Sequence, residues 1–251
     1  MISYKPMSDK PSVRSPWFWV PSLYFAQGIP YVAVMIVSVL MYKRLGVSNT
    51  DIALYTSWLN LPWVIKPFWS PFVDLLKTKR WWVVTMQLLI GAGLAGVAFT
   101  IPTTFFFQAS LAVFWLLAFS SATHDIAADG FYMLALDSHE QAFFVGIRST
   151  FYRIAIIAGQ GVLVMFAGFL ENSTGNIPLA WSVTFFILGG LFLALFLYHR
   201  YILPLPKGDK PSATVTPSTI LKEFFATFAS FFKKKHVFVS ILFFLLFRFS
   251  V

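Results

Sequence analysis

Ionisable side chains inside long apolar stretches are the residues of this sequence best suited to chemistry. Asp125 and Asp129 lie four residues apart in one such stretch, and His124 precedes the first of them. On a helix, this spacing places the two carboxylates on one face. Repulsion between neighbouring carboxylates favours a proton on one of them. We therefore expect Asp125, Asp129 and His124 to bind and release protons.

Two arginines in the next apolar stretch could pair with these carboxylates. If the chain turns at His139, Asp129 lies ten residues before the turn and Arg148 nine after it, while Asp125 and Arg153 are each fourteen away. At about 1.5 Å per helical residue, the members of each pair lie at similar depths. Equal depth does not determine how each helix is rotated about its axis, so it does not show which side chains face each other. The charges therefore either join two helices as structural ion pairs or form part of a functional path.

A metal-dependent enzyme is the alternative interpretation of the two aspartates. Asp125 and Asp129 could hold Mg²⁺ against a diphosphate, as in a membrane prenyl- or phosphatidyl-transferase. Such a site needs further carboxylates to balance the metal and the diphosphate. The other acids near apolar stretches form no second acidic motif, so we expect a protein that is not an enzyme; these acids are Asp51, Asp74, Asp137, Glu140 and Glu171.

We also expect no cofactor and no metal ion. The sequence has no cysteine, which excludes disulfides and cysteine-ligated metals. Gly91, Gly93 and Gly96 follow the spacing of a dinucleotide-binding fingerprint, but no strand precedes them. Close packing between helices accounts better for these glycines.

The elements that position these residues are long apolar blocks. The chain of 251 residues is 58% hydrophobic and 12% charged, roughly half the charge of a soluble domain. A helix needs about 20 apolar residues to cross a bilayer, and alternating barrel strands would not be continuously apolar. We therefore predict an all-α membrane protein with six spans and, from Val237, the start of a seventh in 236–251. The predicted spans are 17–42, 51–73, 81–101, 105–136, 143–170 and 179–203, which together form one unit over 17–203.

The net charge of +9 comes from basic residues in the loops between these blocks, so we predict a lipid bilayer as the partner and not nucleic acid. Loops rich in lysine and arginine stay on the cytoplasmic side. Only Lys43 and Arg44 belong to loops of the opposite side. The cytoplasmic set is Lys5, Lys10, Arg14, Lys77, Lys79, Arg80, Arg200, Lys207, Lys210, Lys222 and Lys233 to Lys235.

This pattern predicts a cytoplasmic N-terminal segment, 1–16, and a cytoplasmic segment, 204–235. Residues 204–217 have the composition of a linker. Residues 218–232 place Leu221 and four phenylalanines at helical spacing before three lysines, which indicates an amphipathic helix. That helix lies either in the inner membrane interface or against the cytoplasmic ends of the spans.

Proline and glycine inside two predicted spans should disturb their helices. Gln27 to Pro30 lie in the first span, and Pro62, Pro67 and Pro71 lie in the second. Proline lacks the N–H of a helical hydrogen bond and kinks or breaks a helix. Such breaks often line the cavities of transporters.

Three segments together resemble one family. They read QGIP from Gln27, KPFWSPFVD from Lys66, and HDIAADGF from His124, with Tyr152 and Arg153 following. This set is similar to the AmpG-type permeases and their acetyl-coenzyme A transporter relatives, within the major facilitator superfamily. The resemblance covers the family's first half and differs at His124, where relatives often have glutamine.

The resemblance implies twelve spans in two halves around a central cavity, so that a C-terminal transporter half is a missing partner. It implies a proton-coupled symporter of a sugar-bearing solute, such as an anhydro-muropeptide, in a bacterial inner membrane. The sequence contains no phosphate-binding loop motif, so nothing in it indicates transport driven by ATP. The implied substrate cavity comprises Gln27, Gly28, Pro30, Lys66, Tyr132, Arg148, Tyr152 and Arg153, and the implied gating loop comprises Asp74, Lys77, Lys79 and Arg80, with Ser70 in place of the usual glycine.

The orientation can be tested by labelling single cysteines from either side of the membrane. We expect Ser212→Cys to react only from the cytoplasm and Asn172→Cys only from the opposite side, because of the distribution of basic residues. Labelling of position 212 from outside, with position 172 protected, would reverse the assigned topology.

Overall fold

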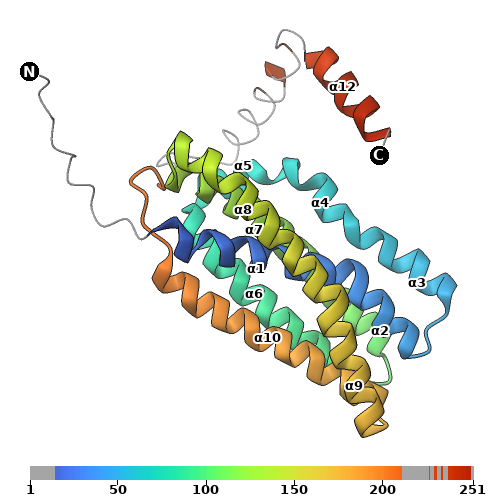
Figure 1. Cartoon of the computed structure of the whole chain (residues 1–251). Helices are drawn as coiled ribbons and strands as arrows, with labels where there is room; N and C mark the ends of the chain where they lie inside the picture. Colours follow the sequence, from blue (N-terminus) through green and yellow to red (C-terminus); the bar gives the residue numbers. More distant parts are fainter. Residues whose placement is uncertain (1–14, 211–225, 227–228, 231–232, 234–236, 250–251) are drawn as a thin grey trace, which may run out of the picture.

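The computed structural model describes residues 15–210, 226, 229, 230, 233 and 237–249, and every regular element in that part of the chain is a helix (Figure 1). Five helical segments are long and apolar enough to cross a membrane. They agree within a few residues with five of the predicted spans, which confirms an all-α membrane protein. These segments are Pro16–Arg44, Lys79–Thr100 (α6), Phe106–Ala135 (α7), Ser138–Thr174 and Ile177–Ile202 (α10).

The predicted second span, 51–73, is a series of short helical pieces and not one continuous helix. Each of its three prolines occupies one of the first two positions of a new piece, where the missing N–H has no helical partner to lose. Lys66 begins the second 3₁₀ turn of this series. The pieces are α3 (Asn49–Thr56), a 3₁₀ turn (Ser57–Asn60), α4 (Leu61–Ile65), a 3₁₀ turn (Lys66–Phe68) and α5 (Ser70–Leu76).

Two other spans each contain a π-helical turn. In the first span, Ala33–Val37 separates α1 (Val20–Val32) from α2 (Ser38–Arg44). In the span that follows α7, the turn Gly159–Leu163 separates α8 (Ser138–Ala158) from α9 (Val164–Thr174). The two π-helical turns pack against each other. Such wide turns occur often at functional sites.

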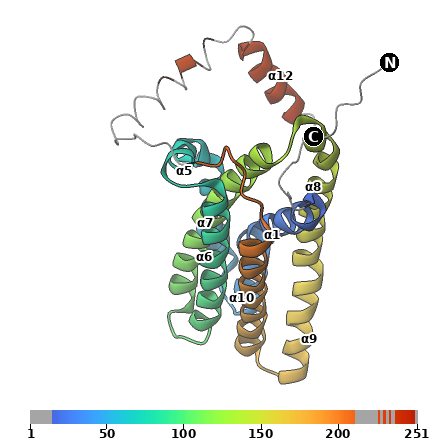
Figure 2. The same ribbon diagram turned by 90° about the vertical axis from the view of Figure 1, so that its left-hand side faces the viewer.

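Helix α6 lies between α7 and α10, and α1 packs along α8 (Figures 1 and 2). The glycines of α6 allow its close contacts. A Cβ atom at Gly91 would lie 3.3 Å from the carbonyl oxygen of Gly189 on α10, and one at Gly93 would lie 2.7 Å from a Leu117 methyl group on α7. These contacts confirm that the glycine spacing serves helix packing.

The helix ends show where the predicted hairpin turns. Asp137 and Glu140 form a capping box at the start of α8, so the chain reverses at 136–137 and not at His139. The start of the predicted seventh span is helical, as α12 (Val237–Phe249). The N-terminal segment 1–14 and most of the predicted amphipathic helix at 218–232 lie outside the described residues.

A close backbone contact joins α1 to α8. A Cβ atom at Gly28 would lie 2.7 Å from the Ala155 Cβ and 2.9 Å from the Tyr152 carbonyl oxygen. Real Cβ atoms do not approach other atoms this closely, and backbone cannot move aside as a flexible side chain can. Gly28, predicted as a cavity residue, therefore sets the distance between two helices.

We expect Gly28→Ala to destabilise the protein by about 1–3 kcal/mol, because the added methyl group must push α1 and α8 apart. The measurement is thermal unfolding of the purified protein in detergent. Gly168→Ala is the matched control, since a Cβ there meets nothing within 4 Å, and it should be neutral or stabilising. Equal melting temperatures for the wild type and Gly28→Ala would show that this contact does not limit helix spacing.

Candidate functional site

Three spans meet at an ion pair between Asp129 and Arg148, and the hydroxyl of Tyr24 forms hydrogen bonds with both. The Tyr24 hydroxyl on α1 donates to Oδ1 of Asp129 on α7 at 3.0 Å, and Arg148 on α8 donates to the same hydroxyl at 3.1 Å. The Arg148 guanidinium lies 3.5 Å from the Asp129 carboxylate. The Asp129–Arg148 pair foreseen by depth matching is therefore present, and Tyr24 links it to a third helix.

Aromatic rings hold the arginine of this pair on two sides. The Arg148 guanidinium carbon lies 4.9 Å from the centre of the Tyr24 ring and 5.1 Å from that of Tyr132. A cation is attracted to the face of an aromatic ring, more strongly where water is excluded. The Tyr132 hydroxyl donates to the Gln141 carbonyl at 2.5 Å, which fixes the ring. Tyr132 thus supports the site through Arg148.

A cavity of about 420 Å³ adjoins this pair, and every side chain that lines it is polar. Four of the lining residues were predicted as cavity residues, and Asp129 was predicted for proton coupling. Tyr24 and Ser149 were missed. A tyrosine in an apolar stretch gives no signal of its own, and Ser149 lies between better candidates. The lining comprises Tyr24, Gln27, Asp129, Arg148, Ser149, Tyr152 and Arg153.

Asp125 lies next to the cavity and pairs with Lys66. Its side chain is buried, and the Lys66 ammonium nitrogen lies 3.9 Å from Oδ2. Depth matching had pointed to Arg153, so that expectation is wrong. The break in the second span at Lys66–Phe68 brings Lys66 to α7, which a continuous helix would not have predicted. Among described residues, Arg153 has no ion-pair partner and is exposed at the cavity.

Two cavity residues also neighbour the Asp125 carboxylate. Gln27 and Tyr152 line the cavity, and both interact electrostatically with Asp125. Asp125 Oδ1 and Gln27 Oε1 are buried, and neither accepts a hydrogen bond from a described residue. The buried carboxylate of Asp125 is thus one residue away from the cavity, and Lys66 is the cation that pairs with it.

His124 faces away from these carboxylates into a buried hydrogen-bonded chain. Its Nε2 lies 3.0 Å from the Gln87 amide nitrogen on α6, and Gln87 Oε1 lies 3.0 Å from His199 Nδ1 on α10. His199 Nε2 lies 2.9 Å from the Ser22 hydroxyl on α1. We call Ser22, His199, Gln87 and His124 the polar chain. It ties α7 to three helices, so the predicted partnership of His124 with Asp125 is not observed.

The predicted gating residues form a capped corner before α6. Asp74 pairs with Lys79, and the Lys77 ammonium lies 5.9 Å from the centre of the Trp81 ring. Asp209 accepts hydrogen bonds from the backbone N–H groups of Lys79 and Arg80 at 2.6 and 3.0 Å. Asp209 was missed, although it is the lone acid within 204–217 and could have been noticed for that reason.

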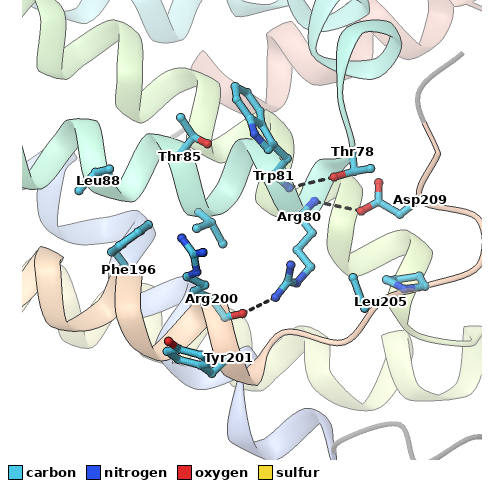
Figure 3. A pocket seen from close by; sticks show the side chains of 12 residues that line it. Thr78, Arg80, Trp81, Thr85, Leu88, Phe196, Arg200, Tyr201, Leu205 and Asp209 are labelled. Atoms are coloured by element: carbon cyan, nitrogen blue, oxygen red, sulfur yellow. Dashed lines mark hydrogen bonds between the residues drawn. The ribbon is translucent and has the colours of Figure 1, made fainter.

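Arg80 completes this corner from the other direction. Its guanidinium donates to the carbonyl oxygens of Leu203, at 3.3 Å, and of Arg200 (Figure 3). These carbonyls lie at the C-terminal end of α10, where the last carbonyl groups have no helical N–H to accept from.

Pro30, which was predicted as a cavity residue, lies buried within α1 and does not line the cavity at Asp129.

The opposite ends of the spans hold a separate cluster. Glu171 on α9 accepts a hydrogen bond from Arg44 Nε on α2 at 2.9 Å and another from Trp181 Nε1 on α10 at 2.7 Å.

Among the described residues, no group of three or more histidine, aspartate or glutamate side chains is arranged to hold a metal ion. The carboxylates Asp125 and Asp129 each face a cation of their own.

The fold and this site define a multi-pass membrane protein with a polar cavity between its spans. Residues 25–249 match the BT1 family, and the chain belongs to this family. A Rickettsia conorii relative named AmpG 4 is 29% identical over 186 residues, covering 68% of this chain and 41% of the relative. The anhydromuropeptide permease of Escherichia coli is 24% identical over 234 residues, covering 90% of this chain and 44% of the permease.

These matches confirm the resemblance to AmpG-type permeases that the three sequence segments indicated. The chain spans less than half the length of either relative. The matched region includes α7, α8 and α1 from Phe25 onward, and therefore every lining residue of the cavity except Tyr24.

The Asp129–Arg148 pair can be tested by a double-mutant cycle. We expect Asp129→Asn and Arg148→Gln each to lower stability, because each leaves a partly buried charge without its partner. The double variant should recover about 1 kcal/mol of the summed loss. Thermal unfolding in detergent measures all three.

Asp129→Asn combined with Arg153→Gln is the matched control, since Arg153 has no ion-pair partner among described residues. That combination should be close to additive. Additive losses in both cycles would contradict a specific pair between Asp129 and Arg148.

Proposed function

We propose that this protein is a secondary active transporter, a permease that couples solute movement to protons. The observation that carries the proposal is the all-polar cavity between α1, α7 and α8, beside two acid–base pairs. Charged groups within a membrane are costly, and they mark substrate and ion paths in transport proteins. The naming of two relatives as AmpG 4 and anhydromuropeptide permease supports the same function.

The proposed solute is sugar-bearing and anionic, such as an anhydro-muropeptide. Tyrosine, glutamine and serine side chains of the cavity suit sugar hydroxyls, because each donates and accepts hydrogen bonds. Arg148 and Arg153 suit a carboxylate of the solute, since a guanidinium binds carboxylates through two parallel hydrogen bonds. Arg153 is the first candidate, because it has no acidic partner among described residues to give up.

Asp125 is the proposed proton site. When its carboxylate binds a proton, the attraction to Lys66 at 3.9 Å is lost, and the broken second span is released from α7. Gln27 and Tyr152 connect this carboxylate to the solute cavity. Solute bound there and protonation at Asp125 then share a coupling free energy, as symport requires.

The remaining parts of the proposal concern the whole transporter. We propose that a second transporter half closes the cavity on the side that α1, α7 and α8 leave open. Rocking of the two halves would then expose the site alternately to the two sides of the membrane. We propose a bacterial inner membrane on the basis of the Rickettsia and Escherichia coli relatives, and a cytoplasmic N-terminal segment on the basis of the basic loops.

The test compares uphill uptake with exchange in proteoliposomes of the full-length protein. We expect Asp125→Asn to retain exchange of labelled anhydro-muropeptide and to lose pH-driven accumulation by at least about tenfold, because the amide cannot carry the proton. Asp51→Asn is the matched control, since Asp51 is exposed in the first turn of α3 and does not line the cavity. Wild-type accumulation by Asp125→Asn, with unchanged pH dependence, would remove Asp125 from the coupling step.

A further inference from the structure

A second cavity, of about 610 Å³, lies between the N-terminal part of α6 and the C-terminal part of α10 (Figure 3). It shares no lining residue with the polar cavity at Asp129. Its position is the end of the bundle that carries the basic loops. We call it the α6–α10 cavity.

The mouth of this cavity combines cations with exposed aromatic rings. In Figure 3, Arg80 on α6 and Arg200 on α10 enter the space between the helices from opposite sides. Trp81 is 44% exposed and Tyr201 is 70% exposed at the same level. Tryptophan and tyrosine gather at the level of lipid headgroups because their rings have one apolar and one polar part.

The wall of the cavity is mostly apolar away from this end, with Thr85 as a polar residue among apolar ones. Val84 and Leu88 follow on the α6 side, and Phe196 lies one turn before Arg200 on the α10 side. Leu88 is eight residues beyond Arg80, or about 12 Å along the helix. A free anion would use only the mouth, whereas an amphiphile would fill the mouth and the wall together.

The two arginines at the mouth differ in how many contacts they make with the rest of the protein. Arg80 donates to the α10 carbonyls of Leu203 and Arg200, and Asp209 accepts from the α6 backbone. The Arg200 guanidinium is exposed and forms no hydrogen bond or ion pair with a described residue. One cation therefore remains for a ligand, beside a second that is fixed in place.

We propose that the α6–α10 cavity binds one anionic phospholipid, with its phosphate at Arg200 and an acyl chain along Val84, Leu88 and Phe196. Basic pockets between spans at the cytoplasmic side suit anionic headgroups, and the leaflet on that side carries a negative surface potential. The cations and exposed aromatic rings at the mouth and the largely apolar wall beyond them match the headgroup and the acyl chain of such a lipid.

Native mass spectrometry of the full-length protein in detergent tests this site. Phosphatidylglycerol should bind more tightly than phosphatidylcholine with the same acyl chains. Arg200→Gln should weaken phosphatidylglycerol binding roughly fivefold and phosphatidylcholine binding by less, because the choline cation offsets the phosphate charge. Lys207→Gln is the matched control, because it removes the same charge at the same end without lining the cavity, and it should change binding less than twofold.

Two further measurements distinguish a bound phospholipid from a soluble phosphate compound at this site. Leu88→Gln should weaken binding of both lipids, and it carries the test if Arg200→Gln does not fold. Glycerol 3-phosphate should fail to displace phosphatidylglycerol. Displacement by glycerol 3-phosphate at equal concentration would show that the ligand of this site is a soluble phosphate compound and not a phospholipid. Equal phosphatidylglycerol binding by the wild type and both variants would overturn the site.

Discussion

The polar chain from Ser22 through His199 and Gln87 to His124 is the interaction on which the arrangement of the helices depends. Hydrocarbon offers no hydrogen-bond partner, so side chains such as glutamine and histidine there need partners within the protein, and here these lie on other helices. With Gln87 donating to His124 and accepting from His199, and the Ser22 hydroxyl turned to His199 and not to the Trp19 carbonyl, the three links are compatible with two neutral imidazoles, and His124 Nδ1 is left without a partner among the described residues. Four spans are thereby held in one rotational setting, with α6 in the middle.

That rotational setting decides what faces the cavity. With His124 fixed toward α6, the next residue on α7, Asp125, faces the broken second span, and Asp129 faces α1 and α8. One side of α7 thus holds neighbouring helices through His124, and the other side presents the ionisable carboxylates Asp125 and Asp129. Helix α1 takes part in both, because Ser22 ends the polar chain and Tyr24 and Gln27 line the cavity. Its close contact with α8 at Gly28 keeps the two cavity walls at a fixed distance.

Apolar block length was enough to predict five spans, because the bilayer imposes one dimension on all of them. Counting residues from the turn between α7 and α8 also predicted the pair between Asp129 and Arg148. Depth carries no information on rotation, and rotation placed His124 against Gln87 and left Arg153 without Asp125. The partner of Asp125 depended on a third span, whose prolines signalled breaks without specifying where Lys66 would point. Asp209 could have been noticed as the lone acid of its segment, but its contact with α6 could not be predicted, since the contact spans about 130 residues of sequence.

The two π-helical turns have a consequence for how these spans tolerate insertion and deletion. Each such turn holds one residue more than an α-helical turn, and one residue corresponds to about 100° of helix rotation. Loss of one residue within Ala33–Val37 would leave a continuous helix but would swing α2 about its axis, and Arg44 would turn away from Glu171. The same change within Gly159–Leu163 would swing α9, which carries Glu171 itself. Loss of one residue in either π-helical turn would therefore break the contact between Arg44 and Glu171, which joins the first span to the span that follows α7.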